Sequence, residues 1–593
     1  MFDIDDIEYL ILGEDFNYGE ANMWFKNLDK IRNYFNKNHD KFGINILYST
    51  PSCYLKSLND AEKTWPRKTD DFFPYASDPH AYWTGYFTSR ASLKGMIRSA
   101  NSLLQSCKQV HTMGGGGGLT DPRMEAAKRS VAVNQHHDAV TGTAKQHVTD
   151  DYALRLDRGM KGCSEVMMET LGKLSGCQLT EFCPLLNISQ CGHTESRSEV
   201  TVTVYNPRTV LVDTPVRLPV TSSADFTVRS ISSGLEVETQ VVPVPQEVLT
   251  LPGRESTARY ELVFMAENVP ALAYSVFSVQ RQPGPSRVKT EKIQFPVVGK
   301  ISPLMENNQL QVHFNQQGVL TRIKPARGGD EIKISQDFSF YRGAVGNNSQ
   351  PQYRASGAYI FRPASQQATP VGDPVSAYMI RGRVVEEVHQ KFNSWCSQVI
   401  RLYRGQNRVE FEWLIGPLPV QLANTPGLEV ITRYSTDLES QDIFNTDSNG
   451  RFMISRRRNS RPTWELNLTE PVSSNYYPVV SRISLAEQTN SLAEERRQVW
   501  VMTDRAQGGS SLRPGQIELM LHRRLFNDDA FGVGEALNET AFGGGLVVRG
   551  KHSLMPCLDT AVVCDVQSRL VAESHLMKPV VLLGNSCDVS NSR

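Results

Sequence analysis

The sequence has no long apolar run and no excess of charge of either sign. Its uninterrupted apolar stretches, such as residues 580–583, are far shorter than the roughly 20 residues that a membrane-spanning helix requires. Lys and Arg together number 63, and so do Asp and Glu, so no net positive charge attracts phosphates or anionic lipids to the surface. The sequence therefore predicts no membrane span and no nucleic-acid partner.

Two further signals are missing: the Cys-x-x-Cys pair of zinc ribbons and redox sites, and a secretory start. None of the ten cysteines forms such a pair, and residues 1–8 have neither the basic nor the apolar region of a signal peptide. Five cysteines nevertheless cluster between positions 107 and 191, and four Asn-x-Ser/Thr sequons begin at Asn187, Asn347, Asn467 and Asn538. Both features favour the secretory pathway. We therefore expect that an N-terminal segment of the protein is missing from this chain.

The length of 593 residues, of which 40% are apolar, is sufficient for about four domains. Residues 1–88 alternate short apolar runs, at 9–12 and 44–48, with a helix-like segment at 20–35. Short strands that alternate with helices are typical of βαβ units. We therefore assign residues 1–88 to the C-terminal part of an α/β domain.

Residues 89–195 are predicted to form a three-helix bundle. Apolar residues recur every three or four positions between 148 and 174, which places one apolar stripe along a long helix. Two further helices are expected at 89–107 and 121–137, because the glycines of 114–118 and the turn at 141–143 interrupt the helical pattern.

From residue 196 onward the apolar period falls to two, as in 200–204, 310–314 and 409–413, with turn signals between the runs. We therefore predict that residues 196–593 form a β-sandwich region of two or more subdomains, the last one incomplete. The expected fold class is multidomain, with α/β, α and β parts in that order. A fold class does not by itself give a function.

The segment 135–144, QHHDAVTGTA, places two imidazoles and a carboxylate side by side at the end of a predicted helix. Neutral imidazole and carboxylate are zinc ligands. Adjacent residues on a helix diverge by about 100°, so at most one or two of His136, His137 and Asp138 should face one metal ion. The alternative is that these histidines cap helix carbonyls or interact with the helix dipole, which is the more common role of a lone histidine near a helix C-terminus.

A second candidate is the carboxylate pair Glu14 and Asp15, which directly follows a short apolar run. Active sites are common at the C-terminal ends of strands, and burial would raise the pKa of Asp15 and suit it to act as a general acid. The alternative is a solvated loop at the start of the next helix. The aromatic groups at 82–87 and 475–478 suit sugar faces, although core packing is their more common role.

Several strings, taken together and in order, resemble glycoside hydrolase family 38, and most of all its lysosomal α-mannosidase branch. The resemblance covers nearly the whole chain. The strings are 14–25 (EDFNYGEANMWF), 70–75 (DDFFPY), 82–90 (YWTGYFTSR), 135–143 (QHHDAVTGT), 446–450 (TDSNG), 456–458 (RRR), 475–478 (NYYP) and 504–512 (DRAQGGSSL).

The resemblance implies a zinc-dependent retaining glycosidase that removes terminal non-reducing α-D-mannose from N-glycan oligosaccharides in the lysosome. It implies that His137 is a zinc ligand, that Asp138 hydrogen-bonds the mannose and that Asp15 is the general acid/base. Tyr477 would contact the sugar, with Tyr476 as the alternative match. These side chains would then line one pocket, with the tyrosine at its rim.

The resemblance also implies two disulfides, Cys107 with Cys163 and Cys183 with Cys191, and leaves Cys53 unpaired. The four sequons would be glycosylation sites, and whether the chain forms a homo-oligomer stays open.

The chain departs from the family at both ends. The family's His-x-Asp zinc pair and its nucleophilic Asp precede the region matched by residues 12–16, and only eleven residues precede that region here. The similarity fades near Ser574. We therefore expect an incomplete copy of the enzyme that binds no stoichiometric zinc and has no activity by itself. The alternatives are a non-catalytic carbohydrate-binding relative and a Golgi-type processing mannosidase.

Overall fold

The computed structural model describes residues 10–15, 17–116, 121–284, 290–297, 303–419, 426–489 and 494–587. The chain divides into two compact units, the first unit Met1–Asp71 and the second unit Phe72–Arg593. In the described ranges, no helix combines the length and the apolar character needed to cross a membrane.

The described part of the first unit contains the helices α1 (Ala21–Lys37), α2 (His39–Phe42) and α3 (Pro51–Asp60). The helix predicted at 20–35 is therefore present as α1. The strands predicted at 9–12 and 44–48 are not formed within residues 10–12 and 44–48, and residue 9 lies outside the described residues. An extended segment becomes a strand only when a neighbouring strand takes up its N–H and C=O groups, and the described part of this unit offers no such neighbour.

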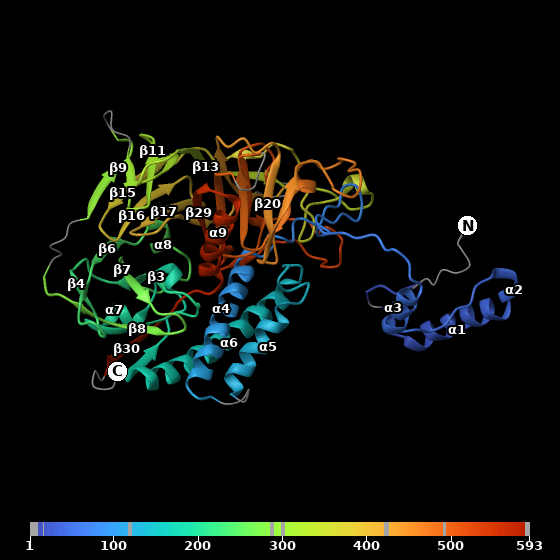
Figure 1. Cartoon of the computed structure of the whole chain (residues 1–593), viewed down its shortest axis with the longest axis horizontal. Helices are drawn as coiled ribbons and strands as arrows, with labels where there is room; N and C mark the ends of the chain where they lie inside the picture. The colour runs from blue at the N-terminus through green and yellow to red at the C-terminus, as the bar shows by residue number, and fades with distance from the viewer. Residues whose placement is uncertain are drawn as a thin grey trace. The chain divides into compact units, whose positions relative to one another are not determined.

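Three helices of the second unit, α4 (Ala91–Met113), α5 (Pro122–Val133) and α6 (Gln146–Ser175), pack against one another, as Figure 1 shows. The long helix predicted from the apolar stripe is α6. Leu103 of α4, Met124 of α5 and Met167 of α6 are buried in a shared apolar cluster. The spacing of the apolar residues thus placed α6 correctly, because this helix buries much of the stripe that predicted it.

The second of these helices is shorter than predicted. α5 ends at Val133, with Asn134 at its C-cap, and residues 134–142 form turns. The side-chain amide of Asn134 donates a hydrogen bond to the carbonyl of Ser130 at 2.9 Å, and such a local bond competes with continuation of the helix. The prediction of a helix to residue 137 was therefore wrong, and the His-His-Asp segment lies on a turn.

Two antiparallel sheets form a sandwich in the second unit. Val388 and Ile400 of sheet I meet Ile334 and Leu519 of sheet II in one buried cluster. Sheet I has the order β21 (Phe452–Arg457), β20 (Ile443–Ser448), β23 (Arg482–Ala486), β24 (Arg496–Thr503), β29 (Val548–Asp559), β18 (Val409–Ile415), β17 (Cys396–Tyr403), β16 (Val385–Lys391), β15 (Ser376–Arg381), β9 (Glu291–Gln294). Sheet II has the order β10 (Leu304–Glu306), β11 (Leu310–Phe314), β12 (Leu320–Pro325), β13 (Ile332–Arg342), β19 (Leu428–Thr436), β26 (Gln516–Arg524), β25 (Gln507–Ser510), β22 (Tyr477–Val479), and β14 (Thr369–Pro370) pairs with β13.

Two smaller sheets enclose a second core, formed mostly by strands between the bundle and the sandwich in the sequence and completed by β30 near the C-terminus. Val202 and Phe277 of sheet III pack with Leu262 and Phe264 of sheet IV. Sheet III has the order β1 (Cys177–Glu181), β30 (Val580–Cys587), β2 (Glu199–Tyr205), β8 (Tyr274–Arg281), β4 (Phe226–Ser230), β5 (Glu236–Val237). Sheet IV has the order β3 (Val212–Val220), β7 (Tyr260–Val269), β6 (Thr239–Pro243).

The region predicted to be β-sandwich also contains a long helix, α9 (Ala561–Leu576), which packs on β24 and β29. The hydroxyl of Thr560 caps it by accepting a hydrogen bond from the N–H of Val563 at 3.4 Å. The remaining short elements are α7 (Gly192–Ser196), α8 (Gln246–Leu249), the 3₁₀ helices η1 (Leu186–Ile188), η2 (Pro351–Tyr353) and η3 (Ser473–Asn475), and the pair β27 (Thr540–Ala541) with β28 (Gly544–Gly545).

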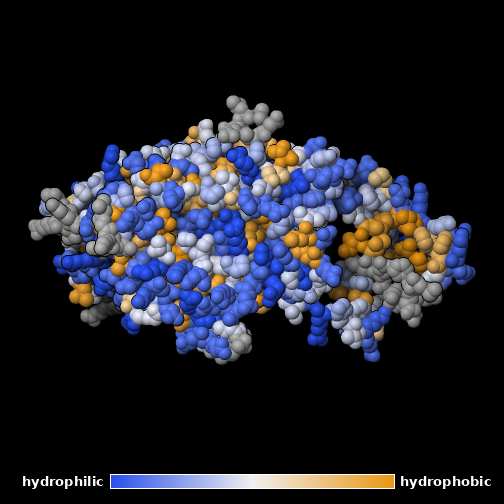
Figure 2. Space-filling view, turned by 90° about the horizontal axis from the view of Figure 1, so that it is seen from above, coloured by the Kyte–Doolittle hydropathy of each residue, from blue (hydrophilic) through white to orange (hydrophobic). Residues whose placement is uncertain are grey.

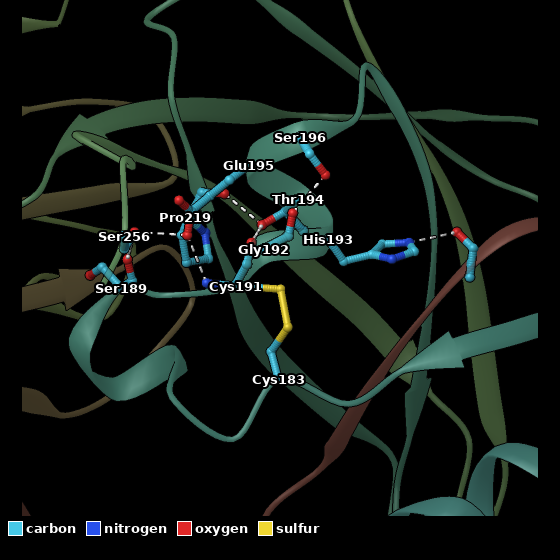
Figure 3. Close-up of a disulfide and its surroundings, with 11 residues drawn as sticks. Cys183, Ser189, Cys191, Gly192, His193, Thr194, Glu195, Ser196, Pro219 and Ser256 are labelled. Atoms are coloured by element: carbon cyan, nitrogen blue, oxygen red, sulfur yellow. Dashed lines mark hydrogen bonds between the residues drawn. A yellow bond between two sulfur atoms is a disulfide. The ribbon is translucent and has the colours of Figure 1, made fainter. Parts of the chain in front are cut away.

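The disulfide between Cys183 and Cys191 is present, and Figure 3 shows it beside α7. Glu195 of α7 accepts a hydrogen bond from the hydroxyl of Ser256 at 2.7 Å, and the hydroxyl of Thr194 donates to the carbonyl of Pro219 at 2.6 Å. The loop closed by the disulfide is thereby also tied to the sheet region by hydrogen bonds.

The disulfide expected between Cys107 and Cys163 is not formed in the structure. Both residues are buried thiols, and a hydrogen bond between them, together with burial, raises the pKa of Cys163. The two thiols therefore face each other across α4 and α6, so their pairing in the mature protein stays a prediction. Cys53 forms no disulfide within the described residues, and its expected unpaired state stays a prediction. Two further disulfides, which the sequence did not indicate, join Cys177 to Cys587 and Cys557 to Cys564.

Candidate functional site

The turn that follows α5 brings together the side chains of the His-His-Asp segment. One ligand atom from each of His136, His137 and Asp138 lies within 4.8 Å of the other two. The Oδ2 atom of Asp138 is 3.4 Å from Nε2 of His136 and 3.6 Å from Nε2 of His137. The expectation that a regular helix would make the three side chains diverge was wrong, because the helix ends before them.

The three donors fit part of a zinc site. Zinc bound tetrahedrally at about 2.0–2.1 Å places neighbouring ligand atoms roughly 3.3 Å apart. The two distances from Asp138 Oδ2 are close to that separation. The side chain of His137 is 85% exposed, so further ligands can approach the cluster from outside the turn.

The second carboxylate oxygen of Asp138 is held by two hydroxyl groups. Thr143 donates to Oδ1 of Asp138 at 2.8 Å, and Tyr359 donates to the same atom at 3.0 Å. Burial and the nearby Asp138 carboxylate raise the pKa of Tyr359 to about 12. The tyrosine hydroxyl is therefore protonated, and able to donate, at any physiological pH.

Two basic side chains from the start of α4 fix the turn itself. The ammonium of Lys94 donates to the carbonyls of Val140 and Thr141 at 2.6 and 2.8 Å, and Arg90 donates to the carbonyl of Ala144 at 2.8 Å. Burial lowers the pKa of Lys94. Gly142 has φ +80°, and a Cβ there would lie 2.3 Å from the carbonyl oxygen of Ser89, so only glycine fits this close approach.

Aromatic side chains flank Tyr359 on the second unit. The ring centroid of Trp83 lies 4.9 Å from that of Tyr359 and 4.9 Å from that of Phe531, and Tyr75 lies 5.3 Å from Trp83. Rings with exposed faces next to polar groups suit the apolar faces and hydroxyls of sugars. The cluster thus supplies an aromatic surface one hydrogen bond away from Asp138.

Buried polar contacts position the backbone of Tyr359. Asp529 accepts hydrogen bonds from the N–H groups of Tyr359 and Ile360 at 2.7 and 2.9 Å, and burial raises the pKa of Asp529. Arg523 donates to the carbonyl of Ile360 at 2.7 Å and pairs with Glu429 at 2.7 Å. The strand residues of sheet II therefore support the segment that carries the tyrosine.

The other predicted site residues have different surroundings. Asp15 is exposed and belongs to the first unit, so its expected convergence with His137 stays a prediction. Tyr477 is buried, with 3% exposed; its hydroxyl accepts a hydrogen bond from Arg461 at 3.1 Å and the guanidinium of Arg456 lies 4.3 Å above its ring. Tyr476 is fully buried and donates to Glu518. The sugar-contacting role of Tyr477 stays a prediction.

Other strings that carried the resemblance have structural contacts. The carboxylate of Asp447 accepts hydrogen bonds from the N–H groups of Gly450, Val480 and Ser481. Arg505 pairs with Asp504 and donates to the carbonyl of Ala91 at the start of α4. The asparagines of the four sequons, Asn187, Asn347, Asn467 and Asn538, are exposed.

Sequence reasoning missed Tyr359, Lys94 and Phe531. Tyr359 is 221 residues from Asp138, and no local pattern distinguishes it from other tyrosines. Thr143 lay inside the His-His-Asp string and Trp83 inside an aromatic string, so the sequence contained a signal for these two residues.

Comparison with protein families gives four consecutive matches. They are the N-terminal domain of glycosyl hydrolases family 38 at residues 6–78, the α-mannosidase middle domain at 81–174, the central domain of lysosomal α-mannosidase-like proteins at 237–279, and the family 38 C-terminal domain at 305–531. The chain belongs to glycoside hydrolase family 38.

Within that family the chain is similar to lysosomal α-mannosidases. It is 42% identical over 587 residues to the enzyme of Cavia porcellus and 42% identical over 589 residues to that of Homo sapiens, and each alignment covers 97% of this chain and 55% of the relative. An α-mannosidase of Arabidopsis thaliana is 37% identical over 572 residues, with 91% of this chain and 54% of the relative covered. The chain thus spans about half the length of the curated relatives it matches.

A solved structure has the same fold. An α-mannosidase from Enterococcus faecalis superposes with a TM-score of 0.58 at 13% sequence identity, covering 92% of this chain and 63% of that chain.

Proposed function

We propose that this chain belongs to a zinc-dependent retaining α-mannosidase that hydrolyses terminal non-reducing α-D-mannose residues of N-glycan oligosaccharides. The observation that carries the proposal is the convergence of His136, His137 and Asp138 on one turn, within 4.8 Å of one another. Family membership and the aromatic cluster beside Asp138 support a sugar substrate.

The proposed roles follow the chemistry of the side chains. His137 would hold the zinc, with Asp138 beside it to hydrogen-bond the mannose, and Tyr477 would complete the sugar site. Bound zinc supplies Lewis-acid stabilisation of oxygen ligands. Asp15 would give a proton to the leaving-group oxygen and later take one from the attacking water, as the acid/base of a retaining glycosidase does.

The similarity to lysosomal enzymes supports a location in the lysosome, and the exposed sequons fit passage through the secretory pathway. A Golgi-type processing mannosidase and a carbohydrate-binding relative without catalysis are the alternatives. The test is hydrolysis of 4-nitrophenyl α-D-mannopyranoside at acidic pH by protein expressed from its own transcript. Sugar binding without hydrolysis would favour the non-catalytic alternative.

The acid role of Asp15 has a specific test in the same protein. Asp15→Asn should reduce hydrolysis by at least about a hundredfold, because general acid/base catalysis contributes roughly 10²–10⁴, and it should leave the zinc content unchanged. Azide should restore turnover of a substrate whose leaving group needs no protonation. Full activity of Asp15→Asn would remove this assignment, and Glu14 would be the next residue to test.

A further inference from the structure

A cavity of about 260 Å³ lies in the second unit between α8 and the strands β15 to β18 of sheet I. Figure 1 shows α8 beside these strands. His389 and Val399 line the cavity, and they alternate with Val388 and Ile400, which face sheet II. The cavity is therefore on the outer face of sheet I, and it shares no lining residue with the turn after α5.

The size of the cavity suits one small molecule, because pockets for drug-sized ligands measure roughly 300–1,000 Å³. Each acidic or basic side chain that lines it already has a partner of the opposite type. The pairs are Lys391 with Glu247 at 3.5 Å, His389 with Glu387 at 2.8 Å, and Glu412 with both Arg401, at 2.8 Å, and Arg549. A charged ligand would have to displace one of these partners, which is costly for a buried pair, so the cavity favours a neutral ligand.

The other polar groups of the lining include hydroxyls and a side-chain amide. Ser397 is 6% exposed, and its hydroxyl makes no hydrogen bond to another of the described residues. A buried hydroxyl without a partner costs free energy, which a hydrogen-bonding ligand recovers. Ser376 and Gln246 add an exposed hydroxyl and an exposed amide, and Val399 and Leu414 add aliphatic surface.

We propose that this cavity is a sugar-binding site that holds one neutral pyranose unit and takes no part in hydrolysis. A pyranose carries hydroxyls along its edge and apolar C–H groups on its faces, and it has no charge. It therefore matches a lining of unpaired hydroxyls, an amide and aliphatic side chains. The inference goes beyond the proposed function, because binding here requires neither a metal ion nor a general acid.

A predicted glycosylation site lies next to the cavity. Arg549, which lines the cavity, donates a hydrogen bond to the carbonyl of Asn187. Ile188 packs with Val248 and Leu414, which also line the cavity. A glycan on Asn187 would therefore be present at a high effective concentration, so that even a weak site would be filled. The pyranose can come from this glycan or from a free glycan in solution.

The experiment uses the full chain, expressed in a secretory host so that its sequons can be glycosylated. Asn187→Gln removes the sequon at an exposed position, and Ser397→Leu, made in the Asn187→Gln background, fills the cavity. Ser335→Leu in the same background is the matched control, because Ser335 is an exposed serine of β13 in sheet II. Amide hydrogen exchange in residues 245–249 would be measured with and without N-acetylglucosamine or methyl α-D-mannopyranoside.

In Asn187→Gln we expect a sugar at ten times its Kd to slow exchange in residues 245–249 about tenfold, because a bound ligand opposes local opening. Ser397→Leu should abolish this slowing, and Ser335→Leu should keep it. Gln246→Ala, which changes an exposed side chain of the same cavity, should weaken it and is the second test if Ser397→Leu does not fold. Absence of slowing with both sugars in Asn187→Gln would overturn the proposal, and so would slowing that neither cavity variant reduces.

The wild type without added sugar distinguishes the two sources of the pyranose. Slower exchange in the glycosylated wild type than in Asn187→Gln, with no further effect of added sugar, assigns the site to the glycan on Asn187. Equal exchange in both proteins, slowed in both by added sugar, assigns it to a free glycan. Because this readout needs no hydrolysis and no zinc, failure of the proposed function would leave it unchanged.

Discussion

The two units of the chain differ sharply in how far their apolar residues are buried. In the first unit, none of the described residues is buried, and Ile11 and Leu47 are 77% and 71% exposed. In the second unit, residues such as Val388 and Leu519 are fully buried between two sheets. Figure 2 shows hydrophobic side chains gathered on the surface of the first unit.

This difference shows which elements form from local interactions alone and which require packing against other parts of the chain. α1 forms in the first unit although it buries no residue, because its hydrogen bonds are made within the helix. The described residues of the segments predicted as strands, 10–12 and 44–48, pair with no neighbouring strand, and a strand completes its hydrogen bonds only with such a neighbour. Exposed apolar surface of this kind usually marks a place where other protein surface binds.

Hydrogen exchange should show the largest contrast between the two units. We expect amides of α1 to exchange at least about a thousandfold faster than those of β13 and β19, because core strands open only with global unfolding, which costs several kcal/mol, whereas a helix without buried contacts opens locally. Mass-spectrometric exchange measurements on the intact protein would check this. Equal protection in both units would show that the first unit has a buried core.

The loss of an ion pair should give the next largest difference in stability between the two units. Arg523 and Glu429 are both fully buried, and their pair is 2.7 Å long. Arg523→Met should cost about 3–5 kcal/mol, because it leaves a buried carboxylate without its partner. Lys56→Met, which breaks an exposed pair with Asp60 in the first unit, should leave the melting temperature unchanged. Thermal unfolding followed by circular dichroism would compare the two variants, and similar small effects would contradict the contrast.

Burial in the second unit should also make the stability of the protein depend on pH. Burial is the main cause that raises the pKa of Glu386 to about 7, and the carboxylates of Glu306 and Glu291 raise it further. The N–H of Glu306 and the charge of Arg381 lower the pKa by less than these causes raise it. The folded protein therefore holds a proton at Glu386 that the unfolded chain releases above about pH 4.5. This contribution to stability is complete below pH 4.5 and is lost as the pH rises through 7.

We accordingly expect Glu386→Gln to be more stable than the wild type at pH 8 by on the order of 2 kcal/mol, and no more stable at pH 4. Urea unfolding at both pH values would measure the difference. The buried His522 and His552, whose pKa values burial lowers to about 4, act in the opposite direction, because the folded state disfavours their protonation as the pH falls below 6.5. Their contribution is common to both proteins and cancels in the comparison.

The smallest expected effect concerns the two thiols of the helical bundle. A hydrogen bond links the buried thiols of Cys107 and Cys163, so we expect a disulfide between them in an oxidising compartment. Peptide mapping without reduction should find Cys107 joined to Cys163 and Cys53 free. A peptide that joins Cys107 to Cys53 would contradict this pairing.

The sequence predicted the parts of the structure that depend on near neighbours. The apolar stripe of α6 and the alternating pattern of β11 were read correctly because each residue's environment follows from its place in a repeating backbone. The end of α5 was misplaced by four residues, since a cap such as Asn134 competes with the helix over a single turn. α9 was missed inside a region of β pattern.

In the candidate site, too, some features follow from the local sequence and others only from the tertiary structure. The sequence by itself determined the chemistry of the turn after α5, because two imidazoles and a carboxylate in succession can serve as metal ligands wherever they lie. Only the tertiary structure decided that the three side chains converge and that Tyr359 donates to Asp138. A contact between residues far apart in sequence depends on how separately formed elements pack, and no local pattern of residues encodes that packing.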